Sequence, residues 1–405
     1  MSVCSNSKTT MNPNHNSDNH HHHHHNINNE IGMTAEEWFQ SGSRVLFDPV
    51  TKRIVSKSQR PETVQVFERV VAPVQPCAQT RWLTMMPGFP DGSYTYAKID
   101  GMLQTAPRLY IEFVGMGDSD TPSNYEYNVM ERADLIEAQW KAHKVRRTVL
   151  VCFACSSMVM MELLQRQTER LALGLPLRTR IEHVLSINGS YFADSYTPML
   201  LHKYCIIRNT VGKAAAWSIQ HSNIIIEPML KKMYSKEYGV TKEELRQIEQ
   251  TIRRHRGALF LVKSINYVEQ HKKYAKRWDL QNVYAATRRQ GVSFTIVGSE
   301  ENPFQQKQFE EVRKRFGTCD DVMIQLIPGG FRATSEQTQR VAELIDGLAM
   351  APAFDESLSS GCGFDRAASQ RGSMSTSSSD TSATDPFSDF GDFEFYFHGS
   401  STSSI

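Results

Sequence analysis

Short apolar runs recur along the central part of the chain, separated by polar and mixed stretches. Runs of this length, bounded by small or polar residues, are typical of buried strands rather than buried helices. A stretch at 158–165 follows the third run closely and suits a helix packed against that strand. The predicted strands are 82–86, 109–114, 147–152, 184–188, 292–297 and 322–327.

The segment between the third predicted strand and its helix has the residue sizes of a nucleophile elbow. Such an elbow is a sharp strand-to-helix turn, and it needs small residues two positions before and after its tip so that the backbone can bend. Cys152 and Ser156 meet this requirement if the tip is Ala154. A tip at Cys155 would instead place the bulky Phe153 where a small residue is needed. The sequence therefore predicts Ala154 at the tip.

Turns rich in glycine and proline follow the other predicted strands. Pro-Gly-Phe-Pro occupies 87–90, and Gly-Met-Gly-Asp-Ser-Asp-Thr-Pro occupies 115–122. Later strands end in Gly-Ser-Glu-Glu-Asn-Pro at 298–303 and in Pro-Gly-Gly-Phe at 328–331. With these turns, residues 36–348 resemble the epoxide-hydrolase-like group of the α/β-hydrolase superfamily, and most of all its mesoderm-specific-transcript-like branch. The narrower match is carried by 88–94, 131–139, 186–189, 198–201 and 267–278.

This resemblance implies a fold and a set of site positions. The fold would be α/β, with a mostly parallel eight-stranded sheet, helices on both faces and an inserted helical cap. The family nucleophile falls on Ala154, and the histidine that precedes it in this branch falls on Phe153. The distal acid falls on Glu301 and the catalytic histidine on Phe331. The oxyanion hole would use the backbone N–H groups of Phe89 and Cys155.

The chemistry of these positions predicts a loss of activity. An epoxide-type hydrolase needs a carboxylate to form an ester and a histidine to activate the water that cleaves it. The methyl group of Ala154 and the phenyl ring of Phe331 can do neither. We therefore expect a pseudohydrolase of the epoxide-hydrolase-like group, which binds a small apolar ligand between cap and core, or a protein partner.

An alternative reading keeps the protein an active epoxide or ester hydrolase with displaced residues. The nucleophile would be Cys155 or Ser156. The base would come from His202, His221 or His255 in the predicted cap, because the last third of the predicted fold contains no histidine.

One helix of the predicted cap is specified by its own residues. Thr241 and Glu244 have the spacing of a capping box, and a helix is expected from about Lys242 to about Arg256. Gly257 can end this helix.

Length and composition predict one large domain between two disordered tails. The 405 residues include an Asn- and His-rich start and a Ser-rich, acidic and aromatic end, neither of which has the composition of a folded core. The expected divisions are a tail at 1–33, the first part of the core at 34–191, the cap at 192–279, the second part of the core at 280–351 and a tail at 352–405.

Charge and cysteine usage exclude several classes of protein. The net charge of +1 favours no global attraction to nucleic acid or membranes. The seven cysteines show no disulfide or zinc spacing, and we expect no metal site and no cofactor. No apolar stretch is long enough to span a bilayer, so we expect a soluble, cytoplasmic protein, although mammalian members of the resembling branch are membrane-associated. The aromatic segment at 385–397 is a candidate for binding a protein partner.

Overall fold

The computed structural model describes residues 32–58, 60–71, 81–123, 125–195, 210–264 and 266–351. The tail expected at 352–405, nearly all of that expected at 1–33 and the candidate base His202 lie outside these ranges. By internal contacts the chain divides into Met1–Gly361 and Cys362–Ile405, and every described residue belongs to the first unit.

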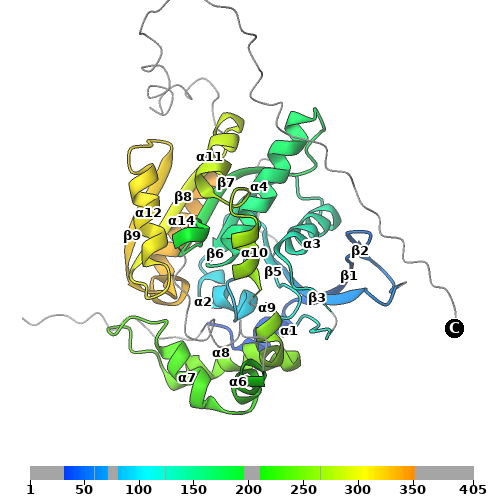
Figure 1. Ribbon diagram of the computed structural model, residues 1–405, viewed down its shortest axis with the longest axis vertical. Coiled ribbons are helices and arrows are strands. Elements are labelled where there is room, and N and C mark those ends of the chain that lie inside the picture. The colour runs from blue at the N-terminus through cyan, green and yellow to red at the C-terminus, as the bar shows by residue number, and fades with distance from the viewer. Residues whose placement is uncertain are drawn as a thin grey trace, which may run out of the picture. The chain divides into compact units, whose positions relative to one another are not determined.

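A single sheet of nine strands forms the centre of the described unit (Figure 1). Its order is β2-β1-β3-β5-β4-β6-β7-β8-β9, and β5, β4, β6, β7, β8 and β9 run parallel, while β1, β2 and β3 join by antiparallel pairing. This mostly parallel sheet confirms the predicted α/β class. The strands are β1 (Ser43–Asp48), β2 (Arg53–Val55), β3 (Val64–Val71), β4 (Trp82–Met86), β5 (Arg108–Ile111), β6 (Arg147–Phe153), β7 (Arg180–Ile187), β8 (Ser293–Glu301) and β9 (Val322–Gly330).

The sheet has nine strands rather than the expected eight because the chain turns back on itself after β1. The carboxylate of Asp48 accepts the backbone N–H groups of Val50 at 2.9 Å and Thr51 at 3.2 Å, and Lys52 adopts a φ of 54°. This tight turn allows the short β2 to pair with β1 at the edge of the sheet.

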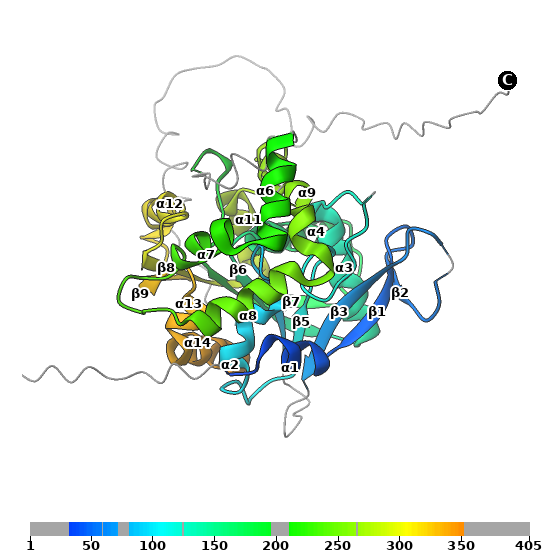
Figure 2. The same ribbon diagram turned by 90° about the horizontal axis from the view of Figure 1, so that it is seen from below.

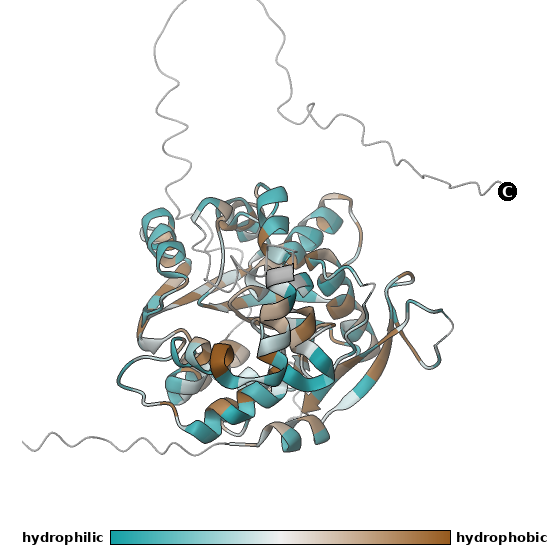
Figure 3. Cartoon of the chain, turned by 60° about the horizontal axis from the view of Figure 1, so that its bottom comes forward, coloured by the Kyte–Doolittle hydropathy of each residue, from teal (hydrophilic) through white to brown (hydrophobic). Residues whose placement is uncertain are grey.

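Helices cover the sheet and form a separate group between β7 and β8 in the chain. Figure 1 shows α6, α7 and α8 close together, apart from α3 and α4, and in Figure 2, seen from below, α7 and α8 lie in front of the sheet. Figure 3 shows hydrophobic colour along the strands and mixed colour on the helices, as expected for elements with one buried face. The helices are α1 (Ala35–Gln40), α2 (Ala97–Asp100), α3 (Val129–Ala142), α4 (Ser156–Ala172), α6 (Thr210–His221), α7 (Asn223–Lys231), α8 (Lys242–Arg253), α9 (Leu261–Ser264), α10 (Tyr267–Lys273), α11 (Leu280–Thr287), α12 (Gln306–Phe316), α13 (Ala333–Glu336) and α14 (Thr338–Met350).

Helix α8 begins where the sequence predicts and ends earlier. Thr241 accepts the backbone N–H of Glu244 at 3.1 Å, as in the expected cap. The helix stops at Arg253 rather than near Arg256, because Arg254 turns to extended backbone with a ψ of 140°. The Arg254 side chain then reaches Asp118 at 2.6 Å. An ion pair outside the helix thus fixes its end.

None of the helices in the described ranges combines the length and the apolar character needed to cross a membrane. The compartment in which the protein works stays a prediction.

Candidate functional site

The turn between β6 and α4 has its tip at Ala154. Strand β6 ends at Phe153, α4 begins at Ser156, and Ala154 adopts a φ of 53°. Residues other than glycine rarely adopt such a positive φ, and they do so where tight geometry requires it. The N–H of Ala154 donates to the carbonyl of Ile187 at 2.9 Å, which anchors the turn to β7. The structure therefore places a methyl group at the tip.

Close approach of the loop after β4 explains the small residues around this turn. A Cβ added at Gly88 would lie 2.5 Å from the ring of Phe153 and 3.3 Å from the Cβ of Ala154. The hydroxyl of Ser156 donates to the carbonyl of Pro87 in the same loop. Ser156 is fully buried, and this bond fixes its side chain between α4 and the loop.

The Cys155 thiol lies against the N–H groups expected to form the oxyanion hole. Burial raises the pKa of this thiol, and the Arg132 guanidinium and the backbone N–H groups of Phe89 and Cys155 oppose the rise to a smaller extent. The thiol is only 3% exposed and stays protonated at neutral pH. The donors that would stabilise an oxyanion therefore face a neutral sulfur atom.

Phe331, which the resemblance places at the position of the family histidine, packs against Phe153. Their ring centroids lie 4.9 Å apart, and Phe304 contacts Phe331 edge-on at 5.4 Å. All three side chains are buried. In the resembling branch Phe153 also stands where a histidine is usual, so two expected histidine positions carry phenyl rings that contact each other. The three rings thus form a buried aromatic cluster that includes Phe153, the neighbour of Ala154 in the turn.

Glu301, at the position of the family acid, lies away from this cluster. It is exposed at the end of β8, where its Oε2 accepts the backbone N–H of Lys236 at 3.4 Å. The buried acid near the Phe331 loop is instead Glu336, whose carboxylate accepts N–H groups from Gly330 at 3.1 Å and Ser235 at 3.0 Å. Burial raises the pKa of Glu336. The hydrogen bond between Ser235 and Glu336 cannot be predicted from the sequence, because these two residues are far apart in the chain.

A buried ion pair joins the two loops that border Ala154. Arg332 Nη1 lies 2.7 Å from Asp91 Oδ2, and each side chain is 2% exposed. Asp91 follows the Pro-Gly-Phe-Pro turn, and Arg332 follows Phe331. Asn188, directly after β7, anchors the Phe331 loop separately, since its Nδ2 donates to the carbonyl of Phe331 at 2.8 Å. Sequence reasoning missed both links, because single charged or amide residues in loops carry no periodic signal.

Arg132 on α3 was also missed, and it lies on the other side of Cys155. Burial lowers the pKa of Arg132, while Cys155 and Tyr267 oppose this effect. Its guanidinium stacks 5.0 Å from the Phe113 ring, a cation–π contact. Its two terminal nitrogens make no hydrogen bond of normal geometry within the described ranges. A buried positive charge therefore sits beside the thiol.

The two candidate bases that lie in the described ranges are engaged elsewhere. His221 lies 2.8 Å through Nδ1 from the carbonyl of Trp217, and His255 lies 2.9 Å through Nε2 from Asp118. Among the described residues, no histidine is hydrogen-bonded to Cys155 or Ser156.

A large cavity lies between the segment before α3 and the helices inserted after β7. It holds about 1070 Å³ and is lined by Tyr127, Glu131, Phe260, Lys263 and Gln270 among others, and Ala154 is not part of its lining. The expected ligand site over Ala154 therefore stays a prediction.

Sequence comparison finds similarity to the mesoderm-specific transcript protein of Mus musculus and to its homolog of Homo sapiens. Each is 25% identical to this chain over 200 residues. The match covers 48% of this chain and 58% of each relative, so it spans little more than half of the relatives' length. No protein-family model matches the chain.

Solved structures with the same arrangement are hydrolytic enzymes of low sequence identity. An esterase from Thermogutta terrifontis has a TM-score of 0.53 at 12% identity, over 76% of this chain and 97% of its own. The haloalkane dehalogenase DatA from Agrobacterium tumefaciens has a TM-score of 0.56 at 13% identity, over 76% of this chain and 95% of its own. At such identities the likeness shows the fold alone. The chain has the α/β-hydrolase fold and is similar in sequence to the mesoderm-specific transcript proteins.

Proposed function

We propose that the protein is a pseudohydrolase, which uses the α/β-hydrolase fold to bind a small apolar ligand or a protein partner without hydrolysing it. The observation that carries the proposal is the contact of Phe153 with Phe331 beside Ala154, with ring centroids 4.9 Å apart. The two expected histidine positions have become parts of one packed cluster. Such packing supports a site that has been rebuilt for stability rather than for proton transfer.

The chemistry of the epoxide-hydrolase-like group supports the same proposal. Opening an epoxide requires a carboxylate, and releasing the ester requires a base that activates water. In a comparable triad, loss of the nucleophile or the base alone lowers turnover by about a millionfold. Ala154 and Phe331 combine both losses, so no hydrolytic cycle through these positions can be completed.

The active-hydrolase alternative finds little support in the geometry. A serine nucleophile needs a base on its hydroxyl, but the hydroxyl of Ser156 donates to the Pro87 carbonyl. A cysteine nucleophile reacts as the thiolate, but burial raises the pKa of Cys155. The neighbouring Arg132 and the backbone N–H groups of Phe89 and Cys155 favour the thiolate, but they do not offset the effect of burial.

A turnover assay tests the proposal. The full-length chain is incubated with aromatic epoxides, p-nitrophenyl esters and haloalkanes, and we expect no rate above that of buffer. Cys155→Ala tests the displaced nucleophile, and Cys319→Ala is its matched control, because Cys319 is another buried free thiol. Saturable turnover that Cys155→Ala abolishes and Cys319→Ala preserves would overturn the proposal.

The apolar surroundings of Ala154 favour an apolar ligand. Removing a carboxylate from water costs free energy, whereas covering the apolar side chains of alanine and phenylalanine with a ligand does not. Fatty-acid epoxides, long-chain esters and terpenoid-like lactones should therefore raise the melting temperature of the full chain. The Ala154→Asp variant should lose this stabilisation, because it returns a charge to the floor. If none of these compounds stabilises the chain, the small-ligand form of the proposal is wrong and only the protein-partner form remains.

A further inference from the structure

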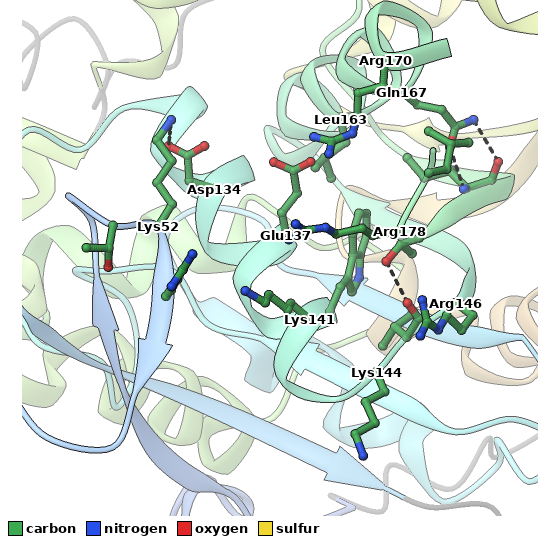
Figure 4. Close-up of a pocket in the computed structure, with 17 residues that line it drawn as sticks. Lys52, Asp134, Glu137, Lys141, Lys144, Arg146, Leu163, Gln167, Arg170 and Arg178 are labelled. Atoms are coloured by element: carbon green, nitrogen blue, oxygen red, sulfur yellow. Dashed lines mark hydrogen bonds and ion pairs between the residues drawn. The ribbon is translucent and has the colours of Figure 1, made fainter. Parts of the chain in front are cut away.

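A second cavity lies at the end of the sheet opposite to Ala154. It is bordered by residues just before β6 and at the start of β7, whereas Ala154 follows the carboxyl end of β6. The turn between β1 and β2, the last turns of α3 and α4, and the loops that follow these helices complete its walls (Figure 4). Its volume is about 550 Å³, within the range of small-molecule sites.

Positive charge dominates the lining of this cavity. Figure 4 shows basic side chains on both of its sides, with Lys52 across from Lys141 and Arg178. The lining contains two acidic residues, Asp134 and Glu137. The seven basic residues of the lining are Lys52, Arg53, Lys141, Lys144, Arg146, Arg170 and Arg178.

The two acids do not neutralise these cations. Asp134 and Glu137 are each bound by Arg166 at 2.7 Å, and Arg166 does not belong to the lining. Among the lining cations, only Lys52 reaches one of them, at 3.2 Å from Asp134. Within the described ranges, no ion pair or side-chain hydrogen bond engages the other six. These six are Arg53, Lys141, Lys144, Arg146, Arg170 and Arg178.

Such a cluster should attract an anion of several charges. The positive charges of the lining repel one another, and a bound anion lowers this electrostatic repulsion. Arginine and lysine both bind phosphate oxygens through charge-assisted hydrogen bonds. A single carboxylate or sulfate would engage only some of the seven cations, whereas an anion with two or more phosphate groups can engage more of them.

The back of the cavity offers a different surface. Trp140, Val145, Leu163 and Ile181 contribute apolar side chains that are at most 4% exposed. The polar Gln167 in the same wall is already bonded to Ile181 and to Gln290. The site therefore combines an apolar wall with a cationic rim. A concave site of this kind suits a small molecule better than a flat protein or membrane surface.

We propose that this cavity binds a small anion with two or more phosphate groups, such as a nucleoside triphosphate or an inositol polyphosphate. This site is independent of the proposed pseudohydrolase function, because none of its residues borders Ala154.

Calorimetric titration of the full-length chain with ATP and with inositol hexakisphosphate at physiological salt tests the proposal. We expect saturable binding of one ligand per chain, weakening as salt rises. The test variant is Lys141→Gln/Arg178→Gln. The matched control is Lys307→Gln/Arg313→Gln on α12, which removes the same charge from exposed residues outside the cavity. The melting temperature of each variant shows that it is folded.

The proposal predicts at least about tenfold weaker binding in Lys141→Gln/Arg178→Gln and a change of less than about twofold in the control. Vesicles of phosphatidylcholine with and without a phosphoinositide distinguish the source of the phosphate. Binding to phosphoinositide vesicles alone, lost in the cavity variant, would assign the phosphates to a lipid headgroup at the same site. Binding of none of the probes, or equal loss in both variants, would overturn the proposal.

Discussion

The Phe331 position combines a polar backbone with an apolar side chain. Its carbonyl accepts a hydrogen bond from Asn188 at 2.8 Å, which fixes the loop, while its ring packs on Phe153 and Phe304. A histidine at this position would place its imidazole among phenyl rings. Phe331 thus combines an anchored backbone with aromatic packing at the position where the resemblance implies a histidine.

This packing predicts an unusual response to restoring the family histidine. Phe331→His should lower the free energy of unfolding by about 1–3 kcal/mol, because it buries polar nitrogens among Phe153 and Phe304. Phe331→Leu is the control, and its cost should be smaller because it keeps an apolar side chain. Urea denaturation at neutral pH measures both. A histidine variant as stable as the leucine variant would show that the site still accommodates the catalytic group.

Glu112 predicts a pH dependence that most acidic residues do not show. Burial raises its pKa to about 8, and the hydrogen bonds from Ser93 oppose this rise only in part. The folded state therefore keeps a proton that the unfolded chain releases above its ordinary pKa of 4.5. Stability should fall as pH rises from about 4.5 to 8, by up to about 1.4 kcal/mol per pH unit, and then level off.

Denaturation of the native chain and of Glu112→Gln at several pH values between 5 and 8 measures this effect. The difference in stability between the two should shift in favour of the variant as pH rises, because the amide cannot ionise. Glu310→Gln, which changes an exposed glutamate on α12, is the control. A difference that does not vary with pH would show that Glu112 titrates normally.

At the scale of elements, the ion pair between Asp91 and Arg332 holds together the loops after β4 and β9. Removal of one partner leaves the other charge buried and unpaired. Arg332→Ala or Asp91→Ala should therefore lower the free energy of unfolding by about 3–5 kcal/mol. The double variant Asp91→Leu/Arg332→Met should be more stable than either single variant, because it buries no charge. Additive losses in the cycle of Asp91→Ala, Arg332→Ala and Asp91→Ala/Arg332→Ala would contradict the assigned pairing.

The elements of the central fold follow largely from local signals in the sequence. Apolar runs predict the buried strands, and the cap at Thr241 predicts where α8 begins. The end of α8 does not follow, because it depends on Arg254 reaching Asp118 at 2.6 Å, a partner far away in the chain. The edge strand β2 is missed for a similar reason, since its three residues have no apolar pattern of their own.

The candidate site can be predicted from the sequence only in part, because local signals mark some of its residues and long-range contacts determine the others. The turn at Ala154 is marked by the small residues that tight backbone geometry requires nearby. The residues that support the turn are not marked, because Asp91 and Arg332 pair only after the sheet has formed. Likewise, Lys52 and Arg178 belong to separate segments, and only the folded chain brings them to one cavity.

At the scale of the whole molecule, an α/β-hydrolase fold carries alanine and phenylalanine where the resemblance implies a nucleophile and a histidine. The sheet order, the turn between β6 and α4 and the helices inserted after β7 are those of an α/β hydrolase. The tip of the turn is a methyl group, the adjoining thiol is neutral, and phenyl rings take the histidine positions. The two ends of the sheet then differ in character, with an apolar floor at Ala154 and a cationic cavity at the opposite end.

Covalent labelling of the full-length chain tests the absence of a working nucleophile most directly. A fluorophosphonate or an iodoacetamide at low concentration should react only with an activated side chain, and intact-mass spectrometry followed by peptide mapping locates the adduct. We predict no adduct on Cys155 or Ser156 in the folded protein, and thiol labelling of Cys155 only after unfolding. Rapid, stoichiometric labelling of Cys155 or Ser156 in the folded chain would contradict the proposed pseudohydrolase function.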